Sequence, residues 1–290
     1  MELSISTSVL FDPHFPQIST EKALERLATA GYHVLDFDFN NWLFDGSPLV
    51  DDNWEQWFKS LRKRADSLEI RFSQAHGPIF NKLENSDKAK WLTKMSIRSL
   101  EAAALLGIRW LVFEPETLLG AFDSAHLEHM MQCNIDWSET LLPTAENTDV
   151  GIAIENIADV FGSKDRGLRR LYCSVPSELI ELVDRFNHRL IGICWDTGHA
   201  NLQRIDQGKA LYSIGNRLKA THVHDNSGER DEHLLPFCGT INWIDVMNAL
   251  QAINYKGDFT YEVNNFIRPL PDTLRDAALR YSIQIGHYLL

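Results

Sequence analysis

The sequence predicts an α/β protein of the (β/α)8 class, a TIM barrel, as a single domain over residues 1–290. Short apolar segments alternate with longer segments of helical period, and the alternation repeats about every 30 to 40 residues. Eight such units fit the length of the chain, and no glycine- or serine-rich linker divides it. An open doubly wound sheet is the alternative, but no Gly-x-Gly-x-x-Gly sequence follows an early strand.

The strands are expected where short apolar runs are bounded by polar or turn-forming residues. These segments are residues 3–9, 33–39, 70–76, 108–114, 150–156, 190–196, 219–225 and 258–263. Residues 227–240 have neither helical nor strand period. A loop of this length in a compact domain is usually a lid or a binding loop.

The helices between the strands have recognisable ends. Thr20 can cap a helix that stops at Gly31, and Ser86 can start another that ends at Gly107. Pro176 suits the first turn of a further helix. Apolar residues at steps of three and four indicate an amphipathic helix that contains Trp54, Phe58, Leu61, Ala65 and Leu68.

The composition excludes several classes of protein. A formal net charge of −12 disfavours nucleic-acid binding, which needs a basic surface, and favours an enzyme or a binding protein for small molecules. No basic leader and no membrane-length apolar run is present, so we expect a cytoplasmic protein with no membrane partner. The four cysteines show no paired spacing, which argues against disulfides and zinc ribbons, and Cys194 is expected in the barrel packing.

Potential metal ligands lie at the ends of six consecutive expected strands, from the third to the eighth. In a barrel these ends form the active-site face, so the side chains should converge. Several carboxylates in one water-poor pocket are costly unless a cation compensates them. The pattern therefore predicts a divalent metal site. Without thiolates, manganese, zinc, cobalt, iron or magnesium is favoured over structural zinc. The candidate ligands are His76, Glu114, Glu155, Asp196, His199, His222, His224 and Glu262.

The seventh strand leaves its ligand open. His222 and His224 share one face because side chains alternate along a strand. Asp231 and His233 follow in the expected loop. They can hold a second metal, or they can organise the loop that closes over the substrate.

These residues resemble the xylose-isomerase-like barrels, which include sugar (phosphate) isomerases and epimerases and the endonuclease IV type of DNA repair enzyme. The resemblance is dense in the C-terminal half of the chain, while the N-terminal half agrees mainly in rhythm and in His76. The motifs that carry it are Ile154-Glu155-Asn156, Asp196-Thr197-Gly198-His199-Ala200, His222-Val223-His224-Asp225-Asn226, Asp231-Glu232-His233, Gly239-Thr240-Ile241-Asn242-Trp243 and Tyr261-Glu262.

The resemblance implies roles for these residues. Its epimerase-like members suggest a metal held by Glu155, Asp196, His224 and Glu262, with Glu155 and Glu262 also acting as base and acid. His224 is favoured over His222 on this ground. The repair enzymes suggest instead a multi-metal cluster, from which the chain departs at Glu114, where they have a histidine. That cluster would use His76, His199, His222, Asp231 and His233.

We expect an enzyme that isomerises or epimerises a small sugar or sugar phosphate by proton abstraction and an enediolate intermediate. The divalent metal would act as a Lewis acid on a polyhydroxy carbonyl substrate. The alternatives are an endonuclease IV-like phosphodiesterase, a dehydratase on the same scaffold and, least favoured, a non-catalytic binding protein. A homo-oligomer is compatible with the sequence.

Several further residues are assigned to the substrate. His199 and His76 are expected to hydrogen-bond its oxygens. Trp42, with Phe44, can form an apolar wall against a sugar face, or it can belong to an aromatic core or a subunit contact. A basic segment after the fifth strand is either a solvated turn or an anion clamp. It contains Lys164, Arg166, Arg169 and Arg170.

Overall fold

A computed structural model of the chain describes residues 1–11, 18–118, 122–161 and 168–290. Eight parallel strands form one sheet in the order β10-β1-β2-β3-β4-β5-β8-β9. They are β1 Leu3–Ser6, β2 Val34–Asp38, β3 Arg71–His76, β4 Trp110–Phe113, β5 Gly151–Glu155, β8 Ile191–Asp196, β9 Leu218–His222 and β10 Phe259–Tyr261. The predicted barrel class is confirmed, because each strand lies within its expected segment except that β9 begins one residue early.

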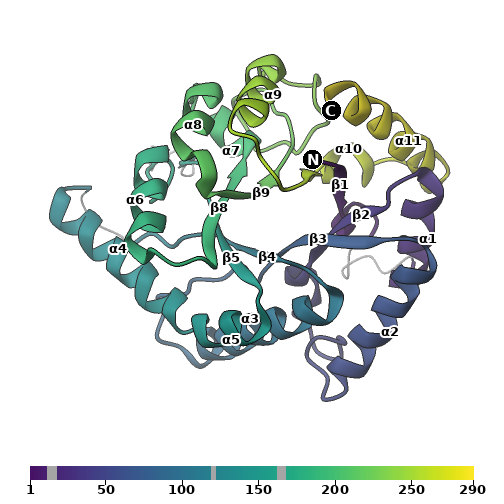
Figure 1. Cartoon of the computed structure of the whole chain (residues 1–290), viewed down its shortest axis with the longest axis horizontal. Coiled ribbons are helices and arrows are strands. Elements are labelled where there is room, and N and C mark those ends of the chain that lie inside the picture. The colour runs from purple at the N-terminus through teal and green to yellow at the C-terminus, as the bar shows by residue number, and fades with distance from the viewer. Residues whose placement is uncertain (12–17, 119–121, 162–167) are drawn as a thin grey trace.

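The sheet closes on itself between β9 and β10. Val223 forms an isolated parallel bridge with Tyr261, and its N–H donates to the carbonyl of Thr260 at 2.7 Å. The Glu262 N–H then donates to the carbonyl of Val223 at 3.0 Å. Figure 1 shows the result, a ring of helices around a central set of strands. None of the described helices is long and apolar enough to cross a membrane.

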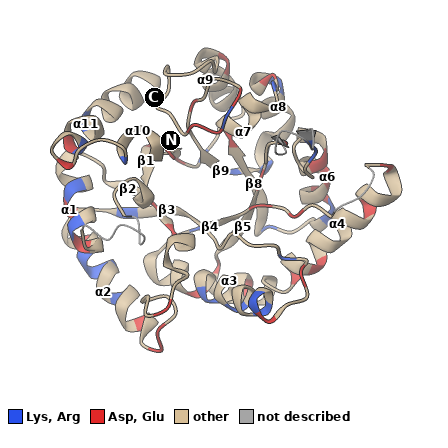
Figure 2. Cartoon of the chain, turned by 180° about the vertical axis from the view of Figure 1, so that it is seen from behind, with Lys and Arg blue, Asp and Glu red and all other residues tan. Residues whose placement is uncertain are grey.

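The helices that cover the strands are α1 Thr20–Ala30, α2 Trp54–Ser67, α3 Asp87–Leu106, α4 Ser124–Glu139, α5 Leu142–Thr148, α6 Pro176–Phe186, α7 Thr197–Leu202, α8 Gln207–Ile214, α9 Trp243–Ala252, α10 Asn264–Ile267 and α11 Asp272–Leu289. Four helices, α1, α2, α3 and α6, begin and end close to the expected residues, and no ends were predicted for the others. Short 3-10 turns occur at η1 Thr7–Val9, η2 Phe39–Trp42 and η3 Gly215–Arg217. Figure 2 shows charges of both signs spread over the outer helices α1, α2 and α3.

The helix ends follow capping chemistry, with one correction. Ser86 caps α3 as expected, since its hydroxyl accepts the Ala89 N–H at 3.1 Å. The cap of α1 is Ser19, which accepts the Lys22 N–H, so Thr20 is the first helical residue. A serine hydroxyl caps a helix at least as well as threonine, so two adjacent candidates could not be separated from the sequence.

A small hairpin after β5 was not expected. It pairs β6 Val160–Phe161 antiparallel with β7 Leu168–Arg169. Two-residue strands are too short to show a period, which explains why they could not be predicted from the sequence.

The interior of the barrel is divided into two unlike halves. On the β4-β5-β8-β9 side, a cluster of Val112, Ala153, Cys194 and Ala220 fills it, so the expected packing role of Cys194 is confirmed. Leu35 and Phe37 of β2 belong to the main core, and strand alternation therefore directs Asp36 to the inside. The buried polar residues of β10, β1, β2 and β3 are Ser4, Ser6, Asp36, Gln74, His76 and Thr260.

Candidate active site

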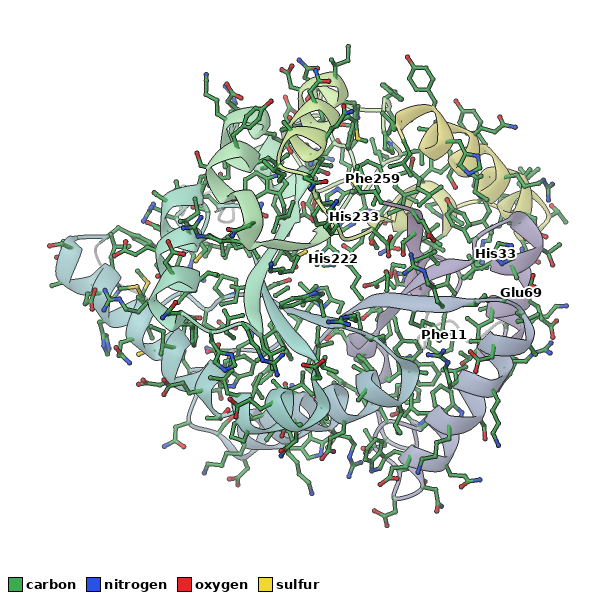
Figure 3. The ribbon with its side chains drawn as sticks, viewed as in Figure 1. Phe11, His33, Glu69, His222, His233 and Phe259 are labelled. Carbon is green, nitrogen blue, oxygen red and sulfur yellow. The ribbon has the colours of Figure 1, made fainter. Side chains whose placement is uncertain are left out.

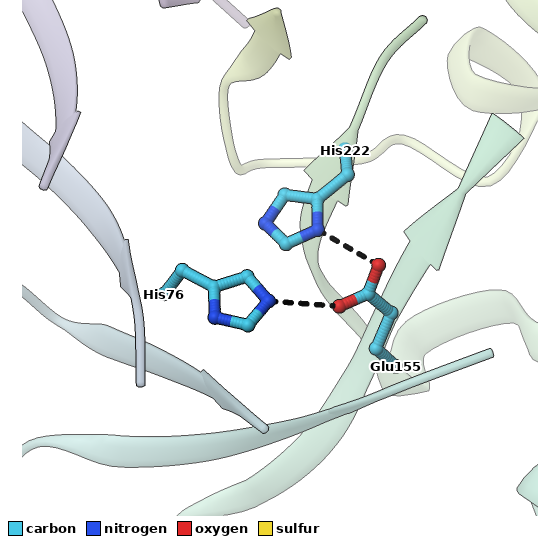
Figure 4. Close-up of side chains that lie close together, drawn as sticks. All are labelled: His76, Glu155 and His222. Carbon is cyan, nitrogen blue, oxygen red and sulfur yellow. Dashed lines mark hydrogen bonds and ion pairs between the residues drawn. The ribbon is translucent and has the colours of Figure 1, made fainter. Parts of the chain in front are cut away.

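The centre of the site is a buried carboxylate between two imidazoles (Figure 4). Glu155 ends β5, and its Oε1 accepts a hydrogen bond from Nδ1 of His222 at 2.9 Å. Its Oε2 lies 3.6 Å from Nε2 of His76, the last residue of β3. The two imidazole rings stack with centroids 5.4 Å apart. Three strand ends far apart in sequence thus meet at one point.

The turn from β8 into α7 supplies the next two groups. Asp196 caps α7 by accepting the His199 N–H at 2.6 Å, which explains the spacing of the Asp-Thr-Gly-His motif. Nδ1 of His199 lies 3.6 Å from Oε1 of Glu155 and 3.7 Å from Oδ1 of Asp196. Glu155, Asp196 and His199 therefore offer three ligand atoms within 4.8 Å of one another.

Glu262, after β10, completes the inner group. Its Oε1 lies 3.7 Å from Nε2 of His222. Asp196, His222 and Glu262 form a further group of three ligand atoms within 4.8 Å. The Glu262 side chain is 12% exposed, whereas that of Glu155 is 2% exposed, so Glu262 is the more accessible of the two expected acid–base carboxylates.

The loop after β9 contributes a second group beside the first. His224 Nε2 lies 3.0 Å from Oδ2 of Asp196 and 3.7 Å from Oδ1 of Asp231. Asp231 Oδ2 also accepts from Nε2 of His233 at 3.0 Å, and the rings of His224 and His233 stack at 4.0 Å. Figure 3 shows His222 and His233 near the middle of the ring of strands. Asp231 and His233 thus belong to the site.

One buried carboxylate organises this loop. Oδ1 of Asp225 accepts the N–H groups of Asn226 and Ile241, and its Oδ2 accepts the Phe237 N–H and the Trp243 indole N–H, at 2.9 to 3.2 Å. These donors lie at both ends of residues 226–241. The segment without periodicity is therefore held by defined bonds, a role of Asp225 that the sequence did not reveal.

The ionisable side chains of the site shift one another's pKa values. Burial opposes the ionised form of Glu155, but the charges of His222, His76 and His199 outweigh it and hold the pKa of Glu155 well below its usual value. Burial likewise opposes the charged form of His76, and the neighbouring Glu155 nevertheless raises the pKa of His76 to about 10. Glu114 shows the opposite effect, because burial and the charge of Glu155 raise its pKa.

Several buried atoms of the site have no protein partner. Glu155 Oε2, His222 Nε2 and His224 Nδ1 are buried without a hydrogen-bond partner among the described residues. Buried polar atoms are rarely left unpaired, so such atoms point to a missing ligand. Oxygen and imidazole nitrogen donors this close together fit a divalent cation. The residues present therefore fit the expected metal.

The distances in the site bear on which histidine, His222 or His224, would bind the first metal. Within the described part of the chain, His222 shares a group with Asp196 and Glu262, and another with His76 and Glu155. His224 shares its group with Asp231 and His233. The assignment of His224 to the first metal stays a prediction, and the distances favour His222 in that place.

The other residues that were expected in the site lie outside these ligand groups. Glu114 follows β4 and belongs to no ligand group found among the described residues. Trp42 is 5% exposed in an aromatic cluster, where it stacks on Phe11 at 4.4 Å and meets Trp57 at 4.9 Å, and its substrate contact stays a prediction. Arg170 pairs with Glu178 and lies 4.2 Å from the ring of Phe122.

The other basic residues of the expected anion clamp are Arg169, Lys164 and Arg166. Arg169 lies in β7 and is exposed. Lys164 and Arg166 lie outside the described residues. Of the two described residues, Arg169 and Arg170, Arg170 has defined partners, and these already compensate its charge. The clamp stays a prediction.

The sequence reading missed two acids at the end of β2. Asp36 is fully buried, and both of its carboxylate oxygens lack a hydrogen-bond partner in the described structure. Burial raises the pKa of Asp36 to about 7, and Glu262 and Asp38 add to the rise. Asp38 Oδ1 is also unpartnered, although its Oδ2 accepts from Asn41 at 2.7 Å. Their i, i+2 spacing within a strand was the available signal.

Sequence comparisons give relatives of several kinds. The uncharacterized protein MJ1311 of Methanocaldococcus jannaschii is 26% identical over 248 residues, which cover 83% of this chain and 80% of that protein. A D-psicose 3-epimerase of Enterocloster bolteae is 30% identical over 40% of this chain and 35% of its own length. The uncharacterized protein y4fM of Sinorhizobium fredii is 42% identical over 28% of this chain, and the match spans about a quarter (26%) of that relative.

Solved structures share the fold at low identity. A D-tagatose 3-epimerase-like protein superposes with a TM-score of 0.73 at 21% identity, covering 99% of both chains. A D-psicose 3-epimerase crystallised in the presence of D-fructose gives a TM-score of 0.75 at 15% identity, covering 100% of this chain and 99% of the other. A family model described as the xylose isomerase-like TIM barrel matches residues 24–282. The chain belongs to the xylose isomerase-like TIM barrel family.

Proposed function

We propose that this protein is a divalent-metal-dependent isomerase or epimerase of a small sugar or sugar phosphate. The observation that carries the proposal is Glu155, a buried carboxylate at the centre of the site. One of its oxygens is bonded to His222, and the other has no hydrogen-bond partner among the described residues and lies 3.6 Å from Nε2 of His76. The printed names of two relatives, D-psicose 3-epimerase and D-tagatose 3-epimerase-like protein, support the same class of reaction.

Glu155, Asp196, His222 and Glu262 would hold the metal, since their ligand atoms form overlapping groups within 4.8 Å. Manganese, zinc, cobalt and magnesium all suit this mixture of carboxylate and imidazole. When bound, the metal would polarise the substrate carbonyl and so acidify the neighbouring carbon.

Proton transfer falls to the two glutamates. Glu155 is held ionised by its imidazole neighbours, which suits it to remove a proton from the carbon next to the carbonyl. Glu262 reaches the same space from the far side of His222 and is more exposed, which suits it to return a proton. A proton removed on one face and returned on the other inverts the carbon, and return to the neighbouring carbon isomerises the sugar.

His199 would orient the substrate. Its Nδ1 donates to the Asn156 carbonyl at 2.9 Å, which fixes the ring. Its Nε2 lies 3.7 Å from Oδ2 of Asp231. A substrate hydroxyl near this nitrogen would be held between an imidazole and a carboxylate, and we assign His199 and Asp231 to substrate positioning.

The test is deuterium uptake. Metal-loaded protein is incubated in D₂O with a panel of aldoses, ketoses and inositol-like compounds, and the site of uptake is located by mass spectrometry. We expect Glu155→Gln to abolish uptake while its circular dichroism spectrum matches wild type, because the variant keeps the fold but loses the base and one of the metal ligands. Glu128→Gln, which removes a side chain that is 56% exposed on α4, is the control and should exchange normally. Normal exchange by Glu155→Gln would contradict the proposal.

A repair-type phosphodiesterase is the second candidate, favoured by the additional ligand group of His224, Asp231 and His233. Two neighbouring metals can activate water for attack on phosphorus. The net charge of −12 opposes binding to duplex DNA. Cleavage of DNA with an abasic site at physiological salt, without deuterium uptake by any sugar, would establish it. Loss of water from a substrate in the same panel would identify a dehydratase.

A further inference from the structure

A cavity lies at the end of the barrel opposite the candidate active site. Its volume is about 910 Å³. Its walls come from the amino ends of the strands, including residues 71–74 of β3, 109–110 before and at the start of β4, and 215–219 leading into β9. No ligand group of the active site takes part in it.

This cavity is positively charged in a protein with a net charge of −12. Two carboxylates line it, those of Glu2 and Asp258, and both are already bound by Arg71, at 3.0 and 2.7 Å. The five basic side chains in its lining are Arg62, Arg71, Arg109, Lys219 and Lys256. Arg62 bonds outward to Asp66 at 2.8 Å.

Three of these cations form no ion pair with a carboxylate among the described residues. Lys219 Nζ donates to the Asn216 carbonyl at 2.7 Å, and Lys256 Nζ donates to Asn254 Oδ1 at 2.5 Å. Arg109 has no side-chain hydrogen bond or ion pair with the rest of the described chain. The pKa of Asp149 is lowered by its bond to Arg189 and, less, by the charge of Arg109. Like charges gathered in one hollow repel one another unless an anion joins them.

The backbone conformation places Lys219 in the wall of this cavity. The register between β8 and β9 shifts at this point, because Ile193 pairs with Leu218 and Cys194 with Ala220, which leaves Lys219 as the extra residue. A Cβ on Gly192 would stand 2.2 Å from Cγ of Lys219, so only glycine leaves room for the lysine stem. Burial also lowers the pKa of Lys219, and its Nζ lies 5.8 Å from the centroid of the Trp110 ring.

We propose that this cavity binds a small phosphorylated anion. A guanidinium and two ammonium groups match the charge and the acceptor geometry of phosphate oxygens. The volume lies in the range of small-molecule sites, which favours a metabolite over a macromolecule. The proposal is independent of the function assigned to the opposite end of the barrel.

The experiment is titration of the whole protein with pyrophosphate, followed by isothermal calorimetry at low and high salt. We expect binding that weakens with salt, and that weakens at least about tenfold in Arg109→Gln/Lys256→Gln, since each lost charge-assisted bond contributes about 1.5 kcal/mol or more. Both side chains are exposed, so the variant should fold. Lys63→Gln, which removes an exposed lysine of α2 outside the cavity lining, is the surface control and should bind as wild type.

Each other outcome overturns the proposal. Pyrophosphate that binds the double variant as tightly as wild type is held elsewhere, for instance at the metal of the active site. Absence of binding at about 10 mM leaves no site of useful affinity. Equal weakening by Lys63→Gln would show a general effect of net charge, and binding of a DNA oligonucleotide in place of pyrophosphate would assign the surface to a macromolecule.

Discussion

At the scale of single residues, Asp36 is the least expected feature of the barrel. It lies within the polar half of the interior, and no described group donates a hydrogen bond to either of its oxygens. An ionised carboxylate in such a place is costly, which is why its pKa rises to about 7. The acid therefore changes its charge near neutral pH, in the same space as His222 and Glu262.

We predict that Asp36→Asn flattens the pH dependence of stability in the metal-free protein. Folding raises this pKa from 3.8 to about 7, so the folded state binds more protons than the unfolded state between these values. Stability contributed by this group is thus lost as pH rises through that window, by up to about 4 kcal/mol. Urea unfolding at several pH values measures it. An unchanged slope in Asp36→Asn, with Asp66→Asn as surface control, would contradict the raised pKa.

A second prediction separates His222, which ends β9, from His224, which follows it. His222→Ala should lose the first metal, because His222 contacts both Glu155 and Glu262. His224→Ala should keep it, because His224 shares no ligand group with Glu155 or Glu262, although its Nε2 lies 3.0 Å from Asp196. Manganese content after dialysis, measured by mass spectrometry, tests this. Loss of the metal in His224→Ala alone would restore the assignment that the family resemblance favoured.

The sequence alone could not decide whether His222 or His224 is the ligand of the first metal. Alternation along the strand placed both on one face, and six strand ends pointed to one site. The deciding distances depend on how the chain turns after His222 and folds Asp231 back over His224. The role of Trp42 could not be decided from the sequence either, because its stacking on Phe11 is a tertiary contact.

At the scale of elements, the loop 227–240 depends on Asp225. We predict that Asp225→Asn destabilises the protein by about 2 to 5 kcal/mol, because one acceptor oxygen becomes a donor facing the N–H groups of Phe237 and Trp243. Hydrogen exchange should rise in the loop before the barrel opens. Glu229→Gln, an exposed residue of the same loop, should change neither quantity. Equal loop protection in Asp225→Asn would contradict the anchoring role.

Elements that have capping residues or a clear apolar period were predictable from the sequence, and elements without such local signals were not. Helix α3 has its serine cap and its terminal Gly107 at φ 76°, as the sequence indicated. The hairpin β6–β7 carries no such signal. The loop looked unstructured because Asp225 holds it through side-chain bonds, which leave no periodicity in the sequence.

At the scale of the whole molecule, the metal and the fold are linked. Glu155, Asp196 and Glu262 converge at the mouth of the barrel, and the neighbouring imidazoles lower the pKa values of Glu155 and Asp196 in the absence of a cation. We predict that Mn²⁺ stabilises the chelator-treated protein, by about 2.7 kcal/mol at a concentration one hundred times its dissociation constant. Differential scanning calorimetry measures the shift. Glu155→Gln should shift less, and a chelator-treated wild type that melts unchanged with Mn²⁺ would contradict metal binding in the folded state.

The barrel itself was predictable because each strand–helix unit repeats the same pattern. The unlike halves of its interior were not, since they depend on which neighbouring strands carry Asp36 and Gln74 and which carry Ala153 and Ala220. No single segment contains that information.

Gly198 ties two distant parts of the sequence to one another. A Cβ at this position would stand 1.9 Å from Cε1 of His224, so the glycine of Asp-Thr-Gly-His leaves room for that imidazole. During divergence of the family, a side chain at 198 therefore becomes tolerable only after position 224 has shrunk. The two positions should vary together among related sequences, with glycine at 198 wherever a bulky residue occupies 224.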